Sequence, residues 1–388
     1  MKVAVFGASG FVGATLVEQL LALRDVEVRP FIHSYGNAWR LSRAGIALHT
    51  VDIMSPSDVA SAITGCTHVV NCTRGSTQVM IEGLSNLLQA SKAAQIRRLV
   101  HVSSVAVYGD MPPAESEREE APTNPVPGSY GAEKLQQDEM IARAAATGLD
   151  SVIICPPNIS GVYSGFVSNV LDDIRAGRFA LVDGGSRPLN VIDVDNLAYA
   201  IICGLRAQKG DARRIFVSDG TGLTWKDLAD QIAPLEEGAT VATLDGPAVA
   251  VPALPVVERG TLWRTMKHLV SSDVRAALRS DPLLAKLDRK MRRLAALGGR
   301  RIEDRLRYSI EGAVKVGKVP DENPYSSRYI AMQMRGVWHR IDRARDVIGY
   351  EPPLSFAASM ERFRIWYAAM NGFGQPYWRL AKLLDTIG

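Results

Sequence analysis

The chain has 388 residues, of which 47% are hydrophobic and 22% charged, and its formal net charge is +4. This length is enough for two domains or for one large α/β unit with a cap, and the composition fits an ordinary soluble globular protein. No uninterrupted apolar run approaches the ~20 residues of a membrane-spanning helix, and the first residues read as a strand and a turn instead of a signal peptide.

A glycine-rich turn lies between a short β-rich run, Lys2 to Phe6, and a helical pattern of leucines. Its glycines follow the spacing G-x-x-G-x-x-G instead of G-x-G-x-x-G. The order strand, turn and helix is the context that a dinucleotide fingerprint requires, because glycines allow close approach to the pyrophosphate and the helix N-terminus attracts its charge. The turn therefore predicts NAD or NADP binding, with an ordinary strand-to-helix turn as the alternative. The predicted contacts are Gly7, Ser9, Gly10, Phe11, Val12 and Gly13.

The second predicted strand, residues 26–32, ends without an acidic residue. His33 and Ser34 stand there, and Arg40 and Arg43 follow. An acid at this point binds the adenosine ribose of NAD and would repel the 2′-phosphate of NADP, whereas a hydroxyl with nearby arginines would accept it. The pattern favours NADP over NAD, through His33, Ser34 and Arg40. The alternative is that both arginines are solvated helix residues.

A tyrosine and a lysine, Tyr130 and Lys134, are four residues apart and would share one face of a helix. A nearby ammonium favours the phenolate, so we expect the pKa of Tyr130 to fall from about 10 towards the working pH. Such a tyrosine can exchange a proton with a substrate hydroxyl or carbonyl, and Ser104 on a neighbouring strand end could hydrogen-bond the same oxygen. These residue types predict hydride transfer at a carbon–oxygen centre, for which a nicotinamide is needed.

Together these residues resemble the extended short-chain dehydrogenase/reductase family, which includes nucleotide-sugar epimerases and 3β-hydroxysteroid dehydrogenases. The resemblance covers residues 1 to about 235 and resumes at 338–367. It rests on the three glycines, the run Ser103 to Gly109, the pair Tyr130 and Lys134, and the run Pro156 to Gly161. It implies that Ser104, Tyr130 and Lys134 form the catalytic set, and that Lys134 also holds the nicotinamide ribose.

The resemblance also implies a fold and its division into domains. The expected class is α/β, a Rossmann-type doubly wound parallel sheet with a smaller, discontinuous C-terminal substrate domain and a helical insertion. The NAD(P)-binding domain is expected at 1–160, with a return segment about 189–218. The substrate domain is expected at 161–188 and 219–388, including a basic helical insertion about 240–336. A homodimer, formed through the helices at 81–94 and 130–146, is implied in the same way.

Further site residues come from matching positions. Asp52 and Ile53 follow the third predicted strand near the adenine, Cys72 ends the fourth beside the cofactor, and Pro157 leads into the substrate region. Asn158 could orient substrate with its amide, or it could only cap a turn. Nucleotide-sugar epimerases often carry an arginine, paired with the diphosphate, at the position where this chain has Leu189. Arg187 is two residues away and could substitute for it on the same strand face, so the resemblance implies that Arg187 binds substrate.

Departures from the family narrow the reaction. Sugar-nucleotide dehydratases carry an Asp-Glu pair directly after the catalytic hydroxyl, where this chain has Val105 and Ala106. Eliminating water requires a group that protonates the leaving hydroxyl, so dehydration is disfavoured. Decarboxylation is disfavoured too, because the glutamate of the decarboxylating relatives is missing at Ala106. What remains is oxidation or reduction, or epimerisation by oxidation and re-reduction.

The sequence therefore predicts an NAD(P)-dependent oxidoreductase or epimerase acting on a small molecule, a nucleotide sugar or a related metabolite. One alternative is a ketoreductase or a 3β-hydroxysteroid-dehydrogenase-like enzyme that acts on a hydrophobic alcohol or ketone. A more remote one is an NADP-sensing protein without turnover. The four cysteines lack metal-ligand spacing and are expected to be reduced thiols, which predicts a cytoplasmic protein without a metal site.

Residues 259–307 contain fourteen Lys/Arg and five Asp/Glu. A basic amphipathic helix of this kind can lie on an anionic membrane, dock an acidic carrier protein or cover a phosphate-bearing substrate. We favour a helical lid with a solvated basic face. Nucleic-acid binding is not expected, because no recognised motif accompanies the charge.

Overall fold

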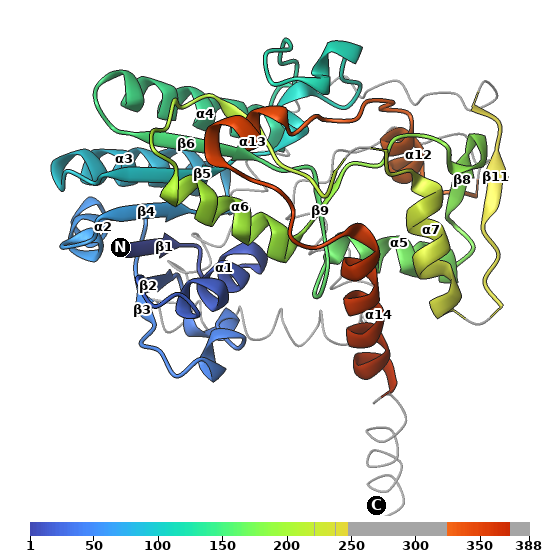
Figure 1. The fold of residues 1–388 in the computed structure, drawn as a ribbon, viewed down its shortest axis with the longest axis horizontal. Helices are drawn as coiled ribbons and strands as arrows, with labels where there is room; N and C mark the ends of the chain where they lie inside the picture. Colours follow the sequence, from blue (N-terminus) through green and yellow to red (C-terminus); the bar gives the residue numbers. More distant parts are fainter. Residues whose placement is uncertain (221, 237, 247–323, 373–388) are drawn as a thin grey trace, which may run out of the picture. The chain divides into compact units, whose positions relative to one another are not determined.

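The computed structural model describes residues 1–220, 222–236, 238–246 and 324–372 (Figure 1). All described elements belong to the first of two units of the chain, residues 1–251 with 323–388. The basic stretch 259–307, and with it the predicted lid or membrane-contact role, lies outside the described residues. The described residues include no helix long and apolar enough to cross a bilayer.

The core of the first unit is a sheet of seven parallel strands in the order β10-β6-β5-β4-β1-β2-β3, which confirms the predicted doubly wound parallel sheet. The strand order reverses between β1 and β4, so the carboxyl ends of these two strands flank the crevice in which such sheets bind ligands. The strands are β1 (Lys2–Phe6), β2 (Glu27–Ile32), β3 (His49–Thr50), β4 (His68–Asn71), β5 (Arg98–Val102), β6 (Ser151–Cys155) and β10 (Arg214–Phe216).

Helices cover both faces of this sheet, because successive side chains of each strand point to opposite faces. Val3 and Val5 of β1 pack in the same hydrophobic cluster as residues of α1 (Phe11–Leu21), α6 (Val194–Arg206) and α13 (Asp342–Ile348). Ala4 and Phe6 of the same strand pack in a second cluster with residues of α2 (Pro56–Ile63), α3 (Leu84–Ala93) and α4 (Tyr130–Ala146). Both faces of β1 are therefore buried.

A separate hydrophobic cluster is built from segments that lie far apart in the sequence. It contains the buried aromatic residues Trp225, Phe179, Tyr329 and Phe363. The elements around it are α5 (Gly165–Arg175), β8 (Ala180–Val182), α7 (Trp225–Ile232), β11 (Ala242–Leu244), α12 (Ser327–Gln333) and α14 (Phe356–Gly372). α7 begins after Thr224, whose side chain forms a capping box with Asp227.

Shorter elements complete the described part. β8 pairs in parallel with β11, and β7 (Asn158–Ser160) pairs in parallel with β9 (Val191–Asp193), each as a two-stranded sheet. Single turns of tighter or wider helix are η1 (Tyr35–Asn37), η2 (Leu41–Arg43), η3 (Val79–Gly83), η4 (Val105–Tyr108), η5 (Ala114–Glu117), η6 (Asp183–Gly185) and η7 (Ala233–Leu235).

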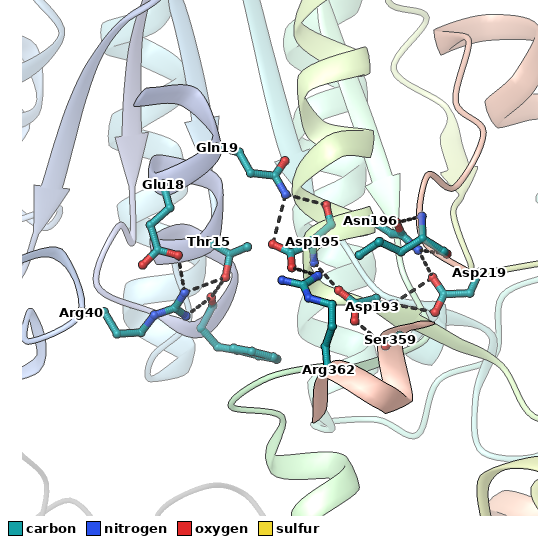
Figure 2. Close-up of polar contacts among 12 residues, drawn as sticks. Thr15, Glu18, Gln19, Arg40, Asp193, Asp195, Asn196, Asp219, Ser359 and Arg362 are labelled. Carbon is teal, nitrogen blue, oxygen red and sulfur yellow. Dashed lines mark hydrogen bonds and ion pairs between the residues drawn. The ribbon is translucent and has the colours of Figure 1, made fainter. Parts of the chain in front are cut away.

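A buried polar cluster joins β9, α6, the segment after β10 and α14 (Figure 2). Both carboxylate oxygens of Asp219 accept a hydrogen bond from the backbone N–H of Asp193, at 2.9 Å each. The Asn196 amide donates to Asp219 at 2.7 Å and to the carbonyl of Leu354 at 2.8 Å, while the Ser359 hydroxyl donates to the Asp193 carboxylate. Burial raises the pKa of Asp219 to about 7 and raises that of Asp193 as well.

We expect the free energy of unfolding to decrease as the pH rises through the range in which Asp219 ionises. The ordinary pKa of an aspartate in the unfolded chain is about 3.9, so between that pH and about 7 the folded state binds more protons than the unfolded state. Asp219→Asn should remove this contribution, on the order of 2 kcal/mol between pH 5 and pH 8. Urea unfolding of both proteins at the two pH values measures it.

The control is Asp346→Asn, because Asp346 is exposed on α13. That variant should keep the pH dependence of the parent protein. An Asp219→Asn protein whose stability changes with pH as the parent does would show that Asp219 ionises normally in the fold.

Candidate active site

The glycine-rich turn after β1 is shaped by close contacts between backbone atoms. Gly7 has a φ of +78°, and a Cβ atom there would lie 2.7 Å from the carbonyl oxygen of Cys72, at the end of β4. A Cβ on Gly13 would collide with the carbonyl of Gly7, so the first turn of α1 rests directly on the loop. α1 begins after Gly10 without a side-chain cap, which leaves its first N–H groups open to an anion. Ser9, Phe11 and Val12 are half-buried in the same turn.

The predicted catalytic serine and tyrosine lie on two elements that touch. Ser104 follows β5 and caps η4, where its Oγ accepts a hydrogen bond from the N–H of Ala106 at 3.2 Å. Tyr130 is the first residue of α4. A Cβ on the next residue, Gly131, would collide with the carbonyl of Ala106, so only glycine lets the first turn of α4 approach η4 this closely. Sequence reasoning missed Gly131, although it directly follows the predicted catalytic tyrosine.

Lys134 lies one helical turn after Tyr130 and is buried. Its Nζ donates a hydrogen bond to the carbonyl oxygen of Val102 at 2.8 Å and lies 5.9 Å from the centroid of the Tyr130 ring. Burial lowers the pKa of Lys134 to about 8, and the negative charge of Asp138 offsets part of that effect. The ammonium form therefore still predominates at neutral pH.

The predicted direction of the Tyr130 pKa is wrong. Tyr130 is 36% exposed, yet desolvation by the surrounding protein raises its pKa to about 12. The strongest opposing charge is Arg74, not the expected Lys134. Desolvation of the phenolate thus outweighs the nearby cations. At neutral pH Tyr130 keeps its proton, as a proton donor to a carbonyl must.

A buried acid that was not predicted from the sequence favours the charged form of this lysine. Asp138 is one helical turn beyond Lys134, and its Oδ2 accepts hydrogen bonds from Ser103 Oγ at 2.9 Å and from Arg214 Nε at 2.7 Å. It therefore connects α4 to the end of β5 and to β10. The signal was present in the sequence, because positions 130, 134 and 138 share one helix face.

Arg40, predicted to bind the cofactor, is held on the side of α1 (Figure 2). Its guanidinium pairs with Glu18 at 2.7 Å and donates to Thr15 Oγ1 at 3.1 Å and to the carbonyl of Phe11 at 3.3 Å. It also lies over the ring of Tyr163, with Cζ 4.7 Å from the ring centroid. Most of its donors are therefore used inside the protein. The sequence gives little indication of these contacts, because Glu18 and Tyr163 are remote from Arg40 along the chain.

The other predicted cofactor residues follow the carboxyl ends of strands. His33, Ser34 and Arg43 are exposed in the segment after β2. Asp52 and Ile53 follow β3, where the Asp52 carboxylate accepts a hydrogen bond from the N–H of Met54 at 2.9 Å. The remaining two, which follow β4 and β6, are Cys72 and Pro157.

The two predicted substrate residues already have protein partners. Arg187 pairs with Asp183 Oδ2 through Nε at 2.9 Å and through Nη2 at 2.6 Å, and the other oxygen of Asp183 accepts from the N–H of Gly246. Asn158, in β7, donates to the carbonyl of Asn190 at 3.4 Å. In the part of the chain that the structure describes, no group of three His, Cys, Asp or Glu side chains is arranged to hold a metal ion.

Known proteins share the sequence pattern. The family model described as "NAD dependent epimerase/dehydratase family" matches residues 3–217. The 4-hydroxy-2-methyl-3-oxo-4-farnesyl-3,4-dihydroquinoline-1-oxide ketoreductase of Stigmatella aurantiaca is 28% identical over 233 residues, which are 57% of this chain and 69% of that protein. A UDP-glucose 4-epimerase of Streptomyces lividans is 26% identical over 266 residues, which are 60% of this chain and 80% of that protein.

Solved structures share the fold. A UDP-glucose 4-epimerase from Thermotoga maritima, in a structure with UDP-glucose, gives a TM-score of 0.63 over 95% of this chain and 99% of that chain. The two sequences are 14% identical, so this likeness concerns the architecture and not the substrate.

Gly131→Ala should disturb the contact between α4 and η4. The added methyl group has no room against the carbonyl of Ala106, so α4 must shift, at an expected loss of about 1–3 kcal/mol in the free energy of unfolding. Gly165→Ala is the control, because nothing lies within 4 Å of a Cβ there, and a helical alanine should be neutral or stabilising by up to about 1 kcal/mol. Denaturant unfolding of both variants tests this, and equal stability would contradict the tight contact.

Proposed function

Because the chain belongs to the NAD dependent epimerase/dehydratase family, and is thus an enzyme of the extended short-chain dehydrogenase/reductase type, we propose that it interconverts a ketone and an alcohol with Tyr130 as the proton donor of the reduction. One observation carries the proposal. Tyr130 keeps its proton at neutral pH and begins a helix whose first turn touches the turn that Ser104 caps.

The glycine turn fits a nicotinamide dinucleotide. Its backbone lies against the end of β4 at the reversal of strand order, and the uncapped N-terminus of α1 offers N–H groups to a pyrophosphate. The turn from Gly7 to Gly13 would hold the diphosphate, and Lys134 the nicotinamide ribose. The cofactor, when bound, supplies the hydride.

The side chains of the protein act on the substrate oxygen. Tyr130 donates its phenolic proton to the carbonyl oxygen as the carbon is reduced, which leaves a neutral alcohol and a phenolate. Ser104 Oγ accepts from the N–H of Ala106 and donates to no other group among the described residues, so its own hydrogen is available to the same substrate oxygen. Lys134, which is charged below a pKa of about 8, stabilises the phenolate that this transfer leaves and so favours the transfer of the proton to the substrate.

Reduction is favoured over the other reactions of the family for two reasons. Val105 and Ala106 offer no acid that could protonate a leaving hydroxyl. Arg187 was expected to bind the diphosphate of a nucleotide sugar, but its Nε and Nη2 both form hydrogen bonds with the Asp183 carboxylate. The ketoreductase relative at 28% identity supports the same choice.

Epimerisation of a nucleotide sugar is the second candidate. It is favoured by the UDP-glucose 4-epimerase relative, which this chain matches over 80% of that protein's length. Such an enzyme uses the same proton transfer twice, in opposite directions, and would need another cation than Arg187 for the diphosphate.

We further propose NADP(H) as the preferred cofactor. The segment after β2 presents exposed His33 and Ser34 without an acid, and Arg43 is exposed nearby in sequence. Since Arg40 is engaged by Glu18, the preference would depend on these three residues. We also propose the division into a nucleotide domain and a discontinuous substrate domain, and a homodimer formed through α3 and α4.

Tyr130→Phe should reduce turnover of a ketone by about 10²- to 10⁴-fold, because it removes the proton donor. Binding of NADPH, followed by its fluorescence, should change little. Tyr199→Phe is the control, since Tyr199 is equally exposed, at 37%, but lies on α6. Turnover that survives in Tyr130→Phe would refute the role of Tyr130.

Ser34→Asp should weaken NADPH binding about tenfold or more, because the new carboxylate repels the 2′-phosphate. NADH lacks that phosphate, so its affinity should stay the same or improve. Fluorescence titration of both cofactors provides the measurement, with NADH as the internal control. Unchanged NADPH affinity would place the 2′-position of the cofactor elsewhere.

A further inference from the structure

The loop after β4 places an arginine over the predicted catalytic tyrosine. The Cζ atom of Arg74 lies 5.0 Å from the centroid of the Tyr130 ring, nearer than the Nζ of Lys134 at 5.9 Å. The loop is fixed on both sides of Arg74. Before it, the N–H and hydroxyl of Thr73 donate to the Asn71 side chain at 3.1 and 2.6 Å; after it, the Thr77 hydroxyl donates to the Glu133 carboxylate of α4.

The guanidinium of Arg74 is exposed and has no ion pair or hydrogen bond with any residue that the structure describes. A cation–π contact of this kind does not require the N–H donors of a guanidinium to hydrogen-bond with the ring. The acid closest along α4, Glu133, accepts a hydrogen bond from Thr77. Arg74 thus offers a rigid fork of donors beside Tyr130, and such a fork matches a carboxylate or a phosphate.

We propose that Arg74 binds an anionic group of the substrate, a carboxylate or a phosphate, which lies a few bonds from the carbonyl that Tyr130 protonates. The inference rests on the proposed function and narrows its substrate class. The guanidinium lies against the tyrosine ring and the reacting oxygen meets the hydroxyl of that ring, so both substrate groups must lie close together. Short α-keto and β-keto acids meet this condition, as do keto compounds with a neighbouring phosphate.

Pairing with an anion would also affect the proton donor. The positive charge of Arg74 lowers the pKa of Tyr130 in the free protein. An anion bound to Arg74 offsets that influence, so binding of an anionic substrate should raise the pKa of Tyr130 relative to the free protein. An uncharged substrate would not have this effect.

The test compares keto acids with their methyl esters, in which a neutral ester replaces the carboxylate. The pairs are pyruvate and methyl pyruvate, acetoacetate and methyl acetoacetate, and benzoylformate and its methyl ester, each with NADPH and the full-length protein. We expect Arg74→Gln to lower kcat/KM for the acids about 10- to 100-fold and to change that for the esters less than about twofold. Arg74→Lys should restore part of the loss.

Arg97→Gln is the matched control. Arg97 is also exposed, but it precedes β5, at the end of that strand remote from Ser104. This variant should leave both kinds of substrate unaffected. NADPH affinity, measured by fluorescence, should be the same in all variants, because the anion is assigned to the substrate and not to the cofactor.

Three results would overturn the proposal. Equal losses for acids and esters would assign Arg74 to the packing of Tyr130, and weaker NADPH binding in Arg74→Gln would assign the anion to the cofactor.

If no compound is turned over, which counts against the proposed function, the same acids and esters are titrated into the NADP-loaded protein. Acid binding that Arg74→Gln weakens about tenfold would still support the anion site, and unchanged binding would refute it.

Discussion

The candidate site depends on places where backbone touches backbone. At Gly7, Gly13 and Gly131 a Cβ atom would collide with a carbonyl or peptide atom of another element, so no other residue permits the same approach. The first two contacts press the turn after β1 against β4 and α1, and the third presses α4 against η4. Everything that the side chains are proposed to do follows from these three contacts, because they set where the helix ends and strand ends meet.

Desolvation, more than charge pairing, sets the chemistry of the polar residues at this edge of the sheet. Burial raises the pKa of Tyr130 and lowers that of Lys134, although the two side chains are neighbours. Asp138, held by Ser103 and Arg214, works against the second effect. The outcome is a neutral donor beside a lysine that remains charged at neutral pH, which suits a reductase better than the phenolate expected from spacing alone.

The sequence was sufficient to predict those features that depend on neighbouring residues alone. The strand–turn–helix order around Gly7 needed only neighbouring residues. Spacing also placed Tyr130 and Lys134 on one helix face. The direction of the change in the Tyr130 pKa could not be predicted from spacing, because it depends on burial. Asp183 and Arg187 are also four residues apart, but they flank a tight turn instead of sharing an α-helix, so helix spacing did not indicate their ion pair.

The sequence was insufficient where remote segments meet. The partners of Arg40 come from α1 and from Tyr163, and the contact between Gly131 and Ala106 joins a helix to a turn more than twenty residues earlier. The cluster around Trp225 likewise gathers residues from α5, α7, α12 and α14. The family resemblance indicated a discontinuous second part, but its packing partners could not be read from periodicity.

The late position of β10 in the chain has a consequence for synthesis. β10 lies at one edge of the central sheet and pairs with β6, with Arg214 opposite Ile153 and Phe216 opposite Cys155. More than fifty residues separate the two strands, so a ribosome that has released only β1 to β6 exposes an apolar strand with an unpaired edge. Such edges invite pairing with other chains. The nascent protein therefore passes through an aggregation-prone interval, which ends when α6 and β10 have emerged and the last strand has docked.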